Sequence, residues 1–123
     1  MDYIKLSDFE INAAVFEALH GGAPDYKEGD TGKMILISYE GDVVGGDAVE
    51  VEVERGVFNP CNNPADAWTI ILSNRISMIW DCSEDANSEW WNAVDQFDEC
   101  RIQYQSNPLR AAMIVFLMMQ EAK

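Results

Sequence analysis

The chain has 123 residues, 48% of them hydrophobic, which is enough for one domain with a core that needs no metal or disulfide to hold it. Its formal net charge is −14, with 22 acidic residues against 8 lysines and arginines. A charge of this size disfavours direct binding of nucleic-acid phosphates and favours a partner protein with a basic surface. We therefore expect one domain over residues 1–123 that does not bind nucleic acid directly.

The N-terminal third contains one clear helix signal. Ser7 and Glu10 have the spacing of a capping box, and the apolar stripe that follows runs to the stop at Gly21-Gly22. Residues 22–32 are rich in turn-forming types and predict a loop.

An antiparallel hairpin is predicted next. Residues 34–39 form an apolar run typical of a largely buried strand, and residues 49–54 alternate strictly between valine and glutamate. This alternation predicts that the valines face the core and the glutamates face water: Val49, Val51 and Val53 inward, Glu50, Glu52 and Glu54 outward.

The stretch FNPCNNPADAW, residues 58–68, is unusually dense in helix-start chemistry. Asn63 is placed as an N-cap before Pro64 at the first helical position, and Asp66 lies in the first turn. Asn107-Pro108 repeats the device before the last helix, which favours a structural role. The alternative, that Asn62, Asp66 and Trp68 also line a surface groove, stays open. The candidate residues of this motif are Asn59, Asn62, Asn63, Asp66 and Trp68.

The segment from Asp81 to Glu99 differs from the rest of the chain because it holds seven carboxylates, no lysine and no arginine. Around Trp91 it fits a short strand, although a helix that groups Trp90, Val94 and Phe97 is also possible. In a strand the adjacent Trp90 and Trp91 point to opposite faces, so one can join the core while the other is partly exposed.

An exposed tryptophan inside an acidic rim has the chemistry of a binding hot spot for a basic partner. The competing interpretation is a solvated acidic loop with both tryptophans in the core. The candidate partner-binding residues are Asp81, Glu84, Asp85, Glu89, Trp90 and Trp91.

The closing helix, residues 108–121, is apolar on nearly every side. Either it lies at the centre of the core or its outer stripe contacts a second copy of the chain. We expect an α+β fold in which a small, mainly antiparallel sheet packs between helices with this helix in the core. If the sheet and the first helix do not cover every side of this helix, the side chains of Met113, Phe116 or Met119 would be left exposed and would support a homodimer through the helix.

Signatures of catalysis are missing from the sequence. It contains no P-loop, dinucleotide-binding fingerprint, EF-hand loop or HExxH motif, and it has a single histidine. A pair of neighbouring acidic residues is weak evidence for a hydrolytic site in a chain that contains 22 carboxylates. We expect no catalytic residue, no metal site and no cofactor.

The location of the protein is also indicated. Three widely spaced cysteines without a CxxC pair are typical of reduced thiols, and the first ten residues lack the features of a signal peptide. The longest apolar run, Ala111–Met119, is too short to cross a bilayer. We expect a cytoplasmic protein without membrane contact.

Three stretches carry a family resemblance: LSDFEIN (6–12), FNPCNNPADAW (58–68) followed by Ile70-Ile71, and NPLRAAMIVFLMMQEA (107–122). They resemble the NinX-type proteins of lambdoid phages and prophages, and more loosely the wider phage ABA-sandwich pattern. The resemblance implies a role during infection of an enteric-type bacterium, in the cytoplasm of the host cell. It supplies no activity and no catalytic residues.

Several function classes remain open. We favour a non-catalytic protein that binds a host or phage protein. The alternatives are a module that sequesters a small host signalling molecule, an acidic DNA mimic, or an unrecognised enzyme. A phosphorylated ligand would need converging cations, which only four arginines can supply: Arg55, Arg75, Arg101 and Arg110.

Overall fold

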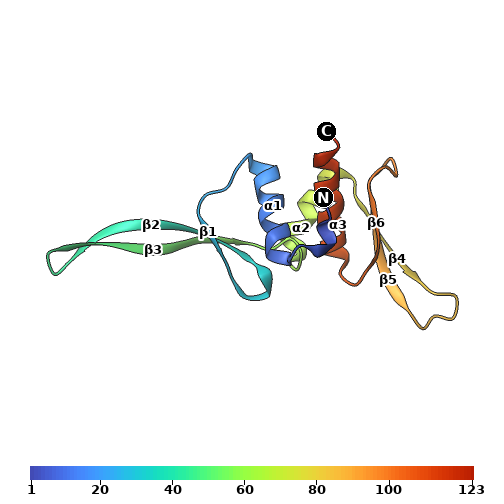
Figure 1. The fold of residues 1–123 in the computed structure, drawn as a ribbon, viewed down its shortest axis with the longest axis horizontal. Helices are drawn as coiled ribbons and strands as arrows, with labels where there is room; N and C mark the ends of the chain where they lie inside the picture. Colours follow the sequence, from blue (N-terminus) through green and yellow to red (C-terminus); the bar gives the residue numbers. More distant parts are fainter.

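The computed structural model describes residues 1–123, apart from the side chains of Asp42 and Val44. Its elements in chain order are η1 (Tyr3–Lys5), α1 (Asp8–His20), β1 (Tyr26–Glu28), η2 (Asp30–Gly32), β2 (Met34–Val44), β3 (Asp47–Phe58), α2 (Pro64–Asn74), β4 (Ser77–Cys82), β5 (Glu89–Val94), β6 (Arg101–Gln105) and α3 (Pro108–Glu121). The molecule is elongated, with a helical body in the middle and a hairpin projecting on each side (Figure 1).

The predicted α+β class is confirmed. The strands of the described residues form two three-stranded antiparallel sheets, in the orders β1-β2-β3 and β4-β5-β6, where the sequence led us to expect one sheet. The helices lie between the two sheets (Figure 1).

The capping signals of all three helices are confirmed. Ser7 and Glu10 form the reciprocal bonds of a capping box before α1, which ends at Gly21 in the left-handed conformation with φ 73°. Asn63 and Asn107 cap α2 and α3, each with a proline at the first helical position. These signals lie within a few residues of each helix start, which is why the sequence alone could place them.

The predicted loop at residues 22–32 contains more structure than expected. β1 lies within it and pairs with the base of β2, with Tyr26 opposite Leu36 and Glu28 opposite Met34. η2 follows directly. A three-residue strand gives too short a pattern to be recognised from its sequence.

The β2–β3 hairpin, which we call the arm, is confirmed as antiparallel, but the predicted burial of its valines is wrong. Val49 and Val51 are 41% and 46% exposed, and Val53 is half-buried. The arm extends away from the helices, so both of its faces meet solvent along most of its length (Figure 1). Strict alternation shows which residues share a face, but it does not show that anything covers that face.

α3 is the centre of the core, as predicted. Residues 111–117 are all buried, and the helix contacts α1, α2 and all three strands of the β4-β5-β6 sheet. Met113 and Phe116 are 0% and 3% exposed, and Met119 is half-buried, so one chain already covers most of this surface. This burial removes the reason we gave for a homodimer through α3, and dimerisation stays a prediction without that support.

No helix in the described part of the chain combines the length and the apolar character needed to cross a bilayer.

Candidate functional site: the β4–β5 hairpin

The asparagine-rich motif at residues 58–68 is a structural junction. The buried Asn12 of α1 donates from Nδ2 to the Gly32 carbonyl and to Asn59 Oδ1, both at 2.9 Å. Asn12 Oδ1 accepts from the Cys61 N–H at 3.1 Å. The N–H of Asn59 in turn donates to Asp66 Oδ2 at 2.8 Å, which closes the turn onto α2. Asp66 therefore holds the entry loop as well as lying in the first turn.

The other asparagines extend this junction to neighbouring elements. Asn62 Nδ2 donates to Asp8 Oδ2 at 3.0 Å and to the Thr31 carbonyl at 3.1 Å. Asn107, the cap of α3, donates to the Cys61 carbonyl at 2.7 Å. Within the described part of the chain, no buried side-chain nitrogen or oxygen lacks a hydrogen-bond partner. The structural interpretation of the motif therefore accounts for its polar side chains.

The structure places the three residues of the groove interpretation, Asn62, Asp66 and Trp68, in different locations. Trp68 is 55% exposed and lines a groove with Leu72 and Met78, whereas Asp66 lines another one with His20 and Phe58. Asn62 is bound to Asp8 and Thr31.

The cysteine of the motif is buried and chemically protected. Cys61 has no exposed surface, and its burial raises the pKa of the thiol to about 12, with the nearby Asp8 carboxylate adding to the effect. The reactive form of a cysteine is the thiolate, so Cys61 is a poor nucleophile in this environment.

The four arginines lie on different elements, and Arg75 is the left-handed C-cap of α2, where it lines the groove that contains Trp68. Arg110 donates to Asp8 Oδ1 at 2.7 Å and to the carbonyls of η1 and Leu6, which ties α3 to the N-terminal segment. Arg55 pairs with Glu40 on the arm, and Arg101 pairs with Asp98 at 3.1 Å. These three guanidinium groups are thus engaged in separate parts of the fold.

The acidic segment forms the β4–β5 hairpin, so the strand interpretation is confirmed and the helical one is wrong. Asp81 lies directly opposite Trp90, and Trp80 opposite Trp91. Since side chains alternate along a strand, the two tryptophans of β5 lie on opposite faces of the sheet. Ala93, on the face of Trp91, is fully buried and lies over α3; we call this the inner face.

The opposite, outer face of this sheet carries Trp90, Asp81 and Ile79. In the described structure no helix or strand lies over it (Figure 1). Trp90 contacts the ring of Tyr104, with 5.1 Å between the ring centroids and 50° between the planes. The outer face is therefore a solvent-facing surface with several large apolar side chains.

Both tryptophans are half-buried, whereas one alternative predicted this for a single tryptophan and the other placed both in the core. Neither belongs wholly to the core, since the hairpin projects past the helices (Figure 1). Their acidic neighbours are divided: Asp81 shares the outer face with Trp90, whereas Glu89 shares the inner face with Trp91. The predicted rim around one exposed tryptophan is thus split between two faces.

The tip of the hairpin, between β4 and β5, contains the remaining two candidates. Asp85 Oδ1 accepts from Ser83 Oγ at 2.6 Å and from the Asn87 N–H at 3.0 Å. The Ser83 bond, followed by those from Asn87, lowers the pKa of the Asp85 carboxyl. Asp85 therefore shapes the turn, while Glu84 is exposed beside it.

Three exposed residues of this surface were missed by sequence reasoning. Ile79, Trp80 and Tyr104 are 46%, 52% and 70% exposed. The apolar run from Ile76 to Trp80 and the residues from Arg101 to Gln105 each predict a strand, and β4 and β6 confirm both, but neither pattern marks a site. The exposure of Ile79 and Trp80 depends on where the helices end, and that of Tyr104 depends on an irregularity in the pairing of β6.

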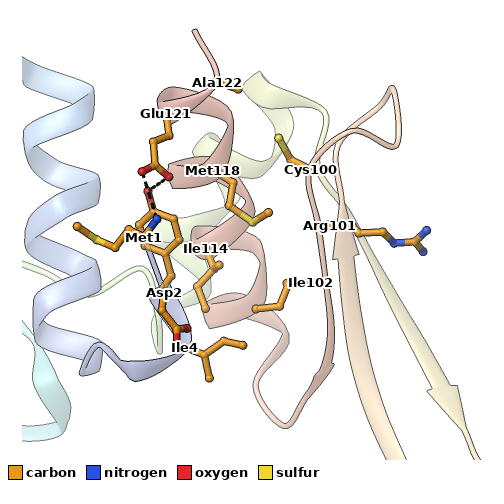
Figure 2. Close-up of a pocket in the computed structure, with 11 residues that line it drawn as sticks. Met1, Asp2, Ile4, Cys100, Arg101, Ile102, Ile114, Met118, Glu121 and Ala122 are labelled. Carbon is orange, nitrogen blue, oxygen red and sulfur yellow. Dashed lines mark hydrogen bonds and ion pairs between the residues drawn. The ribbon is translucent and has the colours of Figure 1, made fainter.

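A cavity of about 510 Å³ lies between α3, the N-terminal segment and the start of β6 (Figure 2). Its walls are mostly apolar, including Ile102, Ile114 and Met118. Glu121 at its edge accepts from the Tyr3 hydroxyl at 2.7 Å and lies 3.4 Å from the Met1 amino group. The Arg101 side chain at the rim points away from α3 (Figure 2).

The described side chains include no group of three or more His, Cys, Asp or Glu residues that could hold a metal ion.

Comparison with known proteins gave one family. The family model described as Bacteriophage P22, NinX matches residues 2–120, nearly the whole chain. No curated protein and no solved structure matches the chain significantly.

Proposed function

Because this chain belongs to the Bacteriophage P22 NinX family, we propose that it is a non-catalytic phage accessory protein that binds a basic surface of a host or phage protein in the cytoplasm of the infected cell. The observation that carries the proposal is the β4–β5 hairpin. It projects from the body with Trp80 exposed on its inner face, and the neighbouring β6 adds the exposed Tyr104 on the outer face of the same sheet. The carboxylates of Asp81 and Glu89 lie on these two faces.

Large exposed aromatics supply binding energy when a partner removes them from water. Trp80 of β4 is 52% exposed on the inner face and Tyr104 of β6 is 70% exposed on the outer face, so the β4-β5-β6 sheet offers such area on both sides. The surrounding carboxylates and the net charge of −14 attract a basic surface. The range of this electrostatic attraction becomes shorter as the salt concentration rises.

The test is affinity purification from infected cells with the Glu84→Lys/Glu89→Lys variant. Both side chains are exposed, and the side-chain bonds that hold the tip turn are made by Ser83, Asp85 and Asn87, so the fold is expected to be retained. The matched control is Glu17→Lys/Glu50→Lys, which changes net charge equally on α1 and the arm. We expect the partner to be lost with the first variant and at high salt, and retained with the control. Equal recovery in every case would refute the proposal.

A second candidate function is supported by the cavity beside α3. Its volume of about 510 Å³ falls within the usual range for small-molecule sites. The walls of the cavity are apolar, and the charged residues at its edge include Asp2 and Glu121, while the Arg101 side chain points away. The cavity therefore suits a neutral or cationic apolar ligand rather than a phosphorylated one. A rise in Tm with small apolar amines, abolished by Ile114→Trp, would support this function, and no rise would reject it.

The DNA-mimic alternative has weaker support. Glu50, Glu52 and Glu54 share one face of the arm, but Lys27 lies 2.7 Å from Glu52 and 3.8 Å from Glu54. This lysine offsets part of the charge that a mimic would need to present.

A further inference from the structure

Tyr104 has an unusual backbone conformation. Its φ is 62°, in the left-handed region that bulky side chains seldom adopt. The other non-glycine residues with positive φ are Thr31, Arg75, Ala86 and Asp98, which lie in a 3-10 helix, a helix cap and two loops. Among the residues described, Tyr104 is the one in this conformation inside a strand. Such strain persists only where the surroundings enforce it, and it is concentrated at functional sites.

A β-bulge enforces this conformation. Trp91 pairs with Gln105 and Ala93 pairs with Ile102, so Gln103 and Tyr104 of β6 together oppose a single residue of β5. That residue is Asn92, whose Oδ1 accepts the Tyr104 N–H at 3.2 Å. A side chain thus replaces the backbone partner that a regular ladder would have supplied.

The bulge places the Tyr104 ring against Trp90 on the outer face, yet leaves the residue 70% exposed. The fold therefore gains little burial from a conformation that is costly to hold. Ile79, opposite Asn92, is 46% exposed, and Asp81 lies opposite Trp90. We call Trp90 and Tyr104 the aromatic platform.

We propose that the aromatic platform, with Asp81 beside it, is the anchor site for an arginine or lysine side chain of the partner. This inference rests on the proposed function, because it assumes a partner with a basic surface. Aromatic faces attract cations through their quadrupole, and a neighbouring carboxylate adds direct charge attraction. The arginine and lysine side chains gain from both features because they are cations at neutral pH.

The charges around the platform fit this occupant. Arg101 lies on the same face but opposite Val94, away from the platform, and it is paired with Asp98. A second copy of the chain is a poor occupant, because each copy carries a net charge of −14.

The first test is an NMR titration of the full chain with the peptide Gly-Arg-Gly-Arg-Gly. We expect shifts at the Trp90 indole and the Tyr104 ring that are absent when citrulline replaces arginine. The Tyr104→Gly and Tyr104→Asn variants tolerate positive φ and lack the ring. Both are expected to bind the peptide about three- to tenfold more weakly, with a Tm equal to or above that of the wild type.

The matched control is Tyr39→Gln, which removes an aromatic ring that is 54% exposed on the arm and is expected to leave peptide affinity unchanged. Unchanged affinity in both Tyr104 variants would overturn the anchor site, and so would a large fall in Tm in both, since that would show a structural role. Partner recovery from infected cells separates the two proposals. If the partner is lost with Glu84→Lys/Glu89→Lys but retained with Tyr104→Gly, the proposed function stands and the anchor site is wrong.

Discussion

Replacing Asn12 with alanine is expected to destabilise the protein strongly, although the residue lies far from any proposed binding surface. Asn12 is fully buried and makes hydrogen bonds to Gly32, Asn59 and Cys61. Its loss leaves the buried Cys61 N–H without that acceptor, whereas Asn59 Oδ1 retains a contact with Asn62 at 3.3 Å.

The magnitude follows from these partners. One fully buried donor left unpaired costs about 1–3 kcal/mol, and the partial losses at Asn59 and Gly32 bring the expected total to about 2–4 kcal/mol. For a chain of this length each kcal/mol corresponds to about 4 °C, so Tm is expected to fall by about 8–16 °C. The assay is thermal and urea unfolding followed by circular dichroism.

Two further variants make the result interpretable. Asn74→Ala removes a single bond to the Ile70 carbonyl and is expected to cost about 1 kcal/mol or less. Combining Asn12→Ala with Asn59→Ala in a double-mutant cycle is expected to show coupling of about 0.5–3 kcal/mol. If Asn12→Ala cost no more than Asn74→Ala, the junction would not be the desolvated network described above.

Three other predictions concern the same body. Asn63→Ala removes the α2 N-cap and is expected to cost about 1 kcal/mol in urea unfolding, with unchanged partner binding. Cys61 is expected to resist iodoacetamide at pH 8 until the chain is unfolded, while the partly exposed Cys82 reacts; rapid labelling of native Cys61 would contradict its burial. Burial and the hydrogen bond to Glu121 raise the pKa of Tyr3 to about 12. The protonated Tyr3 hydroxyl therefore stabilises the folded state below pH 10, and this contribution is lost as pH rises from about 10 to 12. Tyrosinate absorbance is expected to show a late step that Tyr3→Phe removes.

The sequence allowed prediction of features that depend on near neighbours in the chain. The capping box at Ser7 and the asparagine caps at Asn63 and Asn107 are satisfied by backbone groups within three residues. The apolar character of α3 on all sides likewise predicted its central position, because an all-apolar helix must be covered.

Features set by contacts between distant segments could not be predicted. The alternation of Val49 and Val51 is correct for a strand, but their exposure depends on how far the arm projects. Asn12 lies in an ordinary helical pattern, and its role requires residues 47 and 49 positions further along the chain. The exposed ring of Tyr104 depends on a bulge that is defined by its pairing with β5.

The position of α3 has a consequence for how the chain folds. This helix follows every other element described, yet α1, α2 and the β4-β5-β6 sheet all pack on it. During synthesis from the N-terminus, the earlier elements can form locally but have no common core to join until α3 leaves the ribosome. Long-range contacts of this kind slow folding, because distant segments must be ordered before any burial compensates. The body is therefore expected to assemble in one late step, while the arm, whose strands are joined by a short turn, can pair earlier.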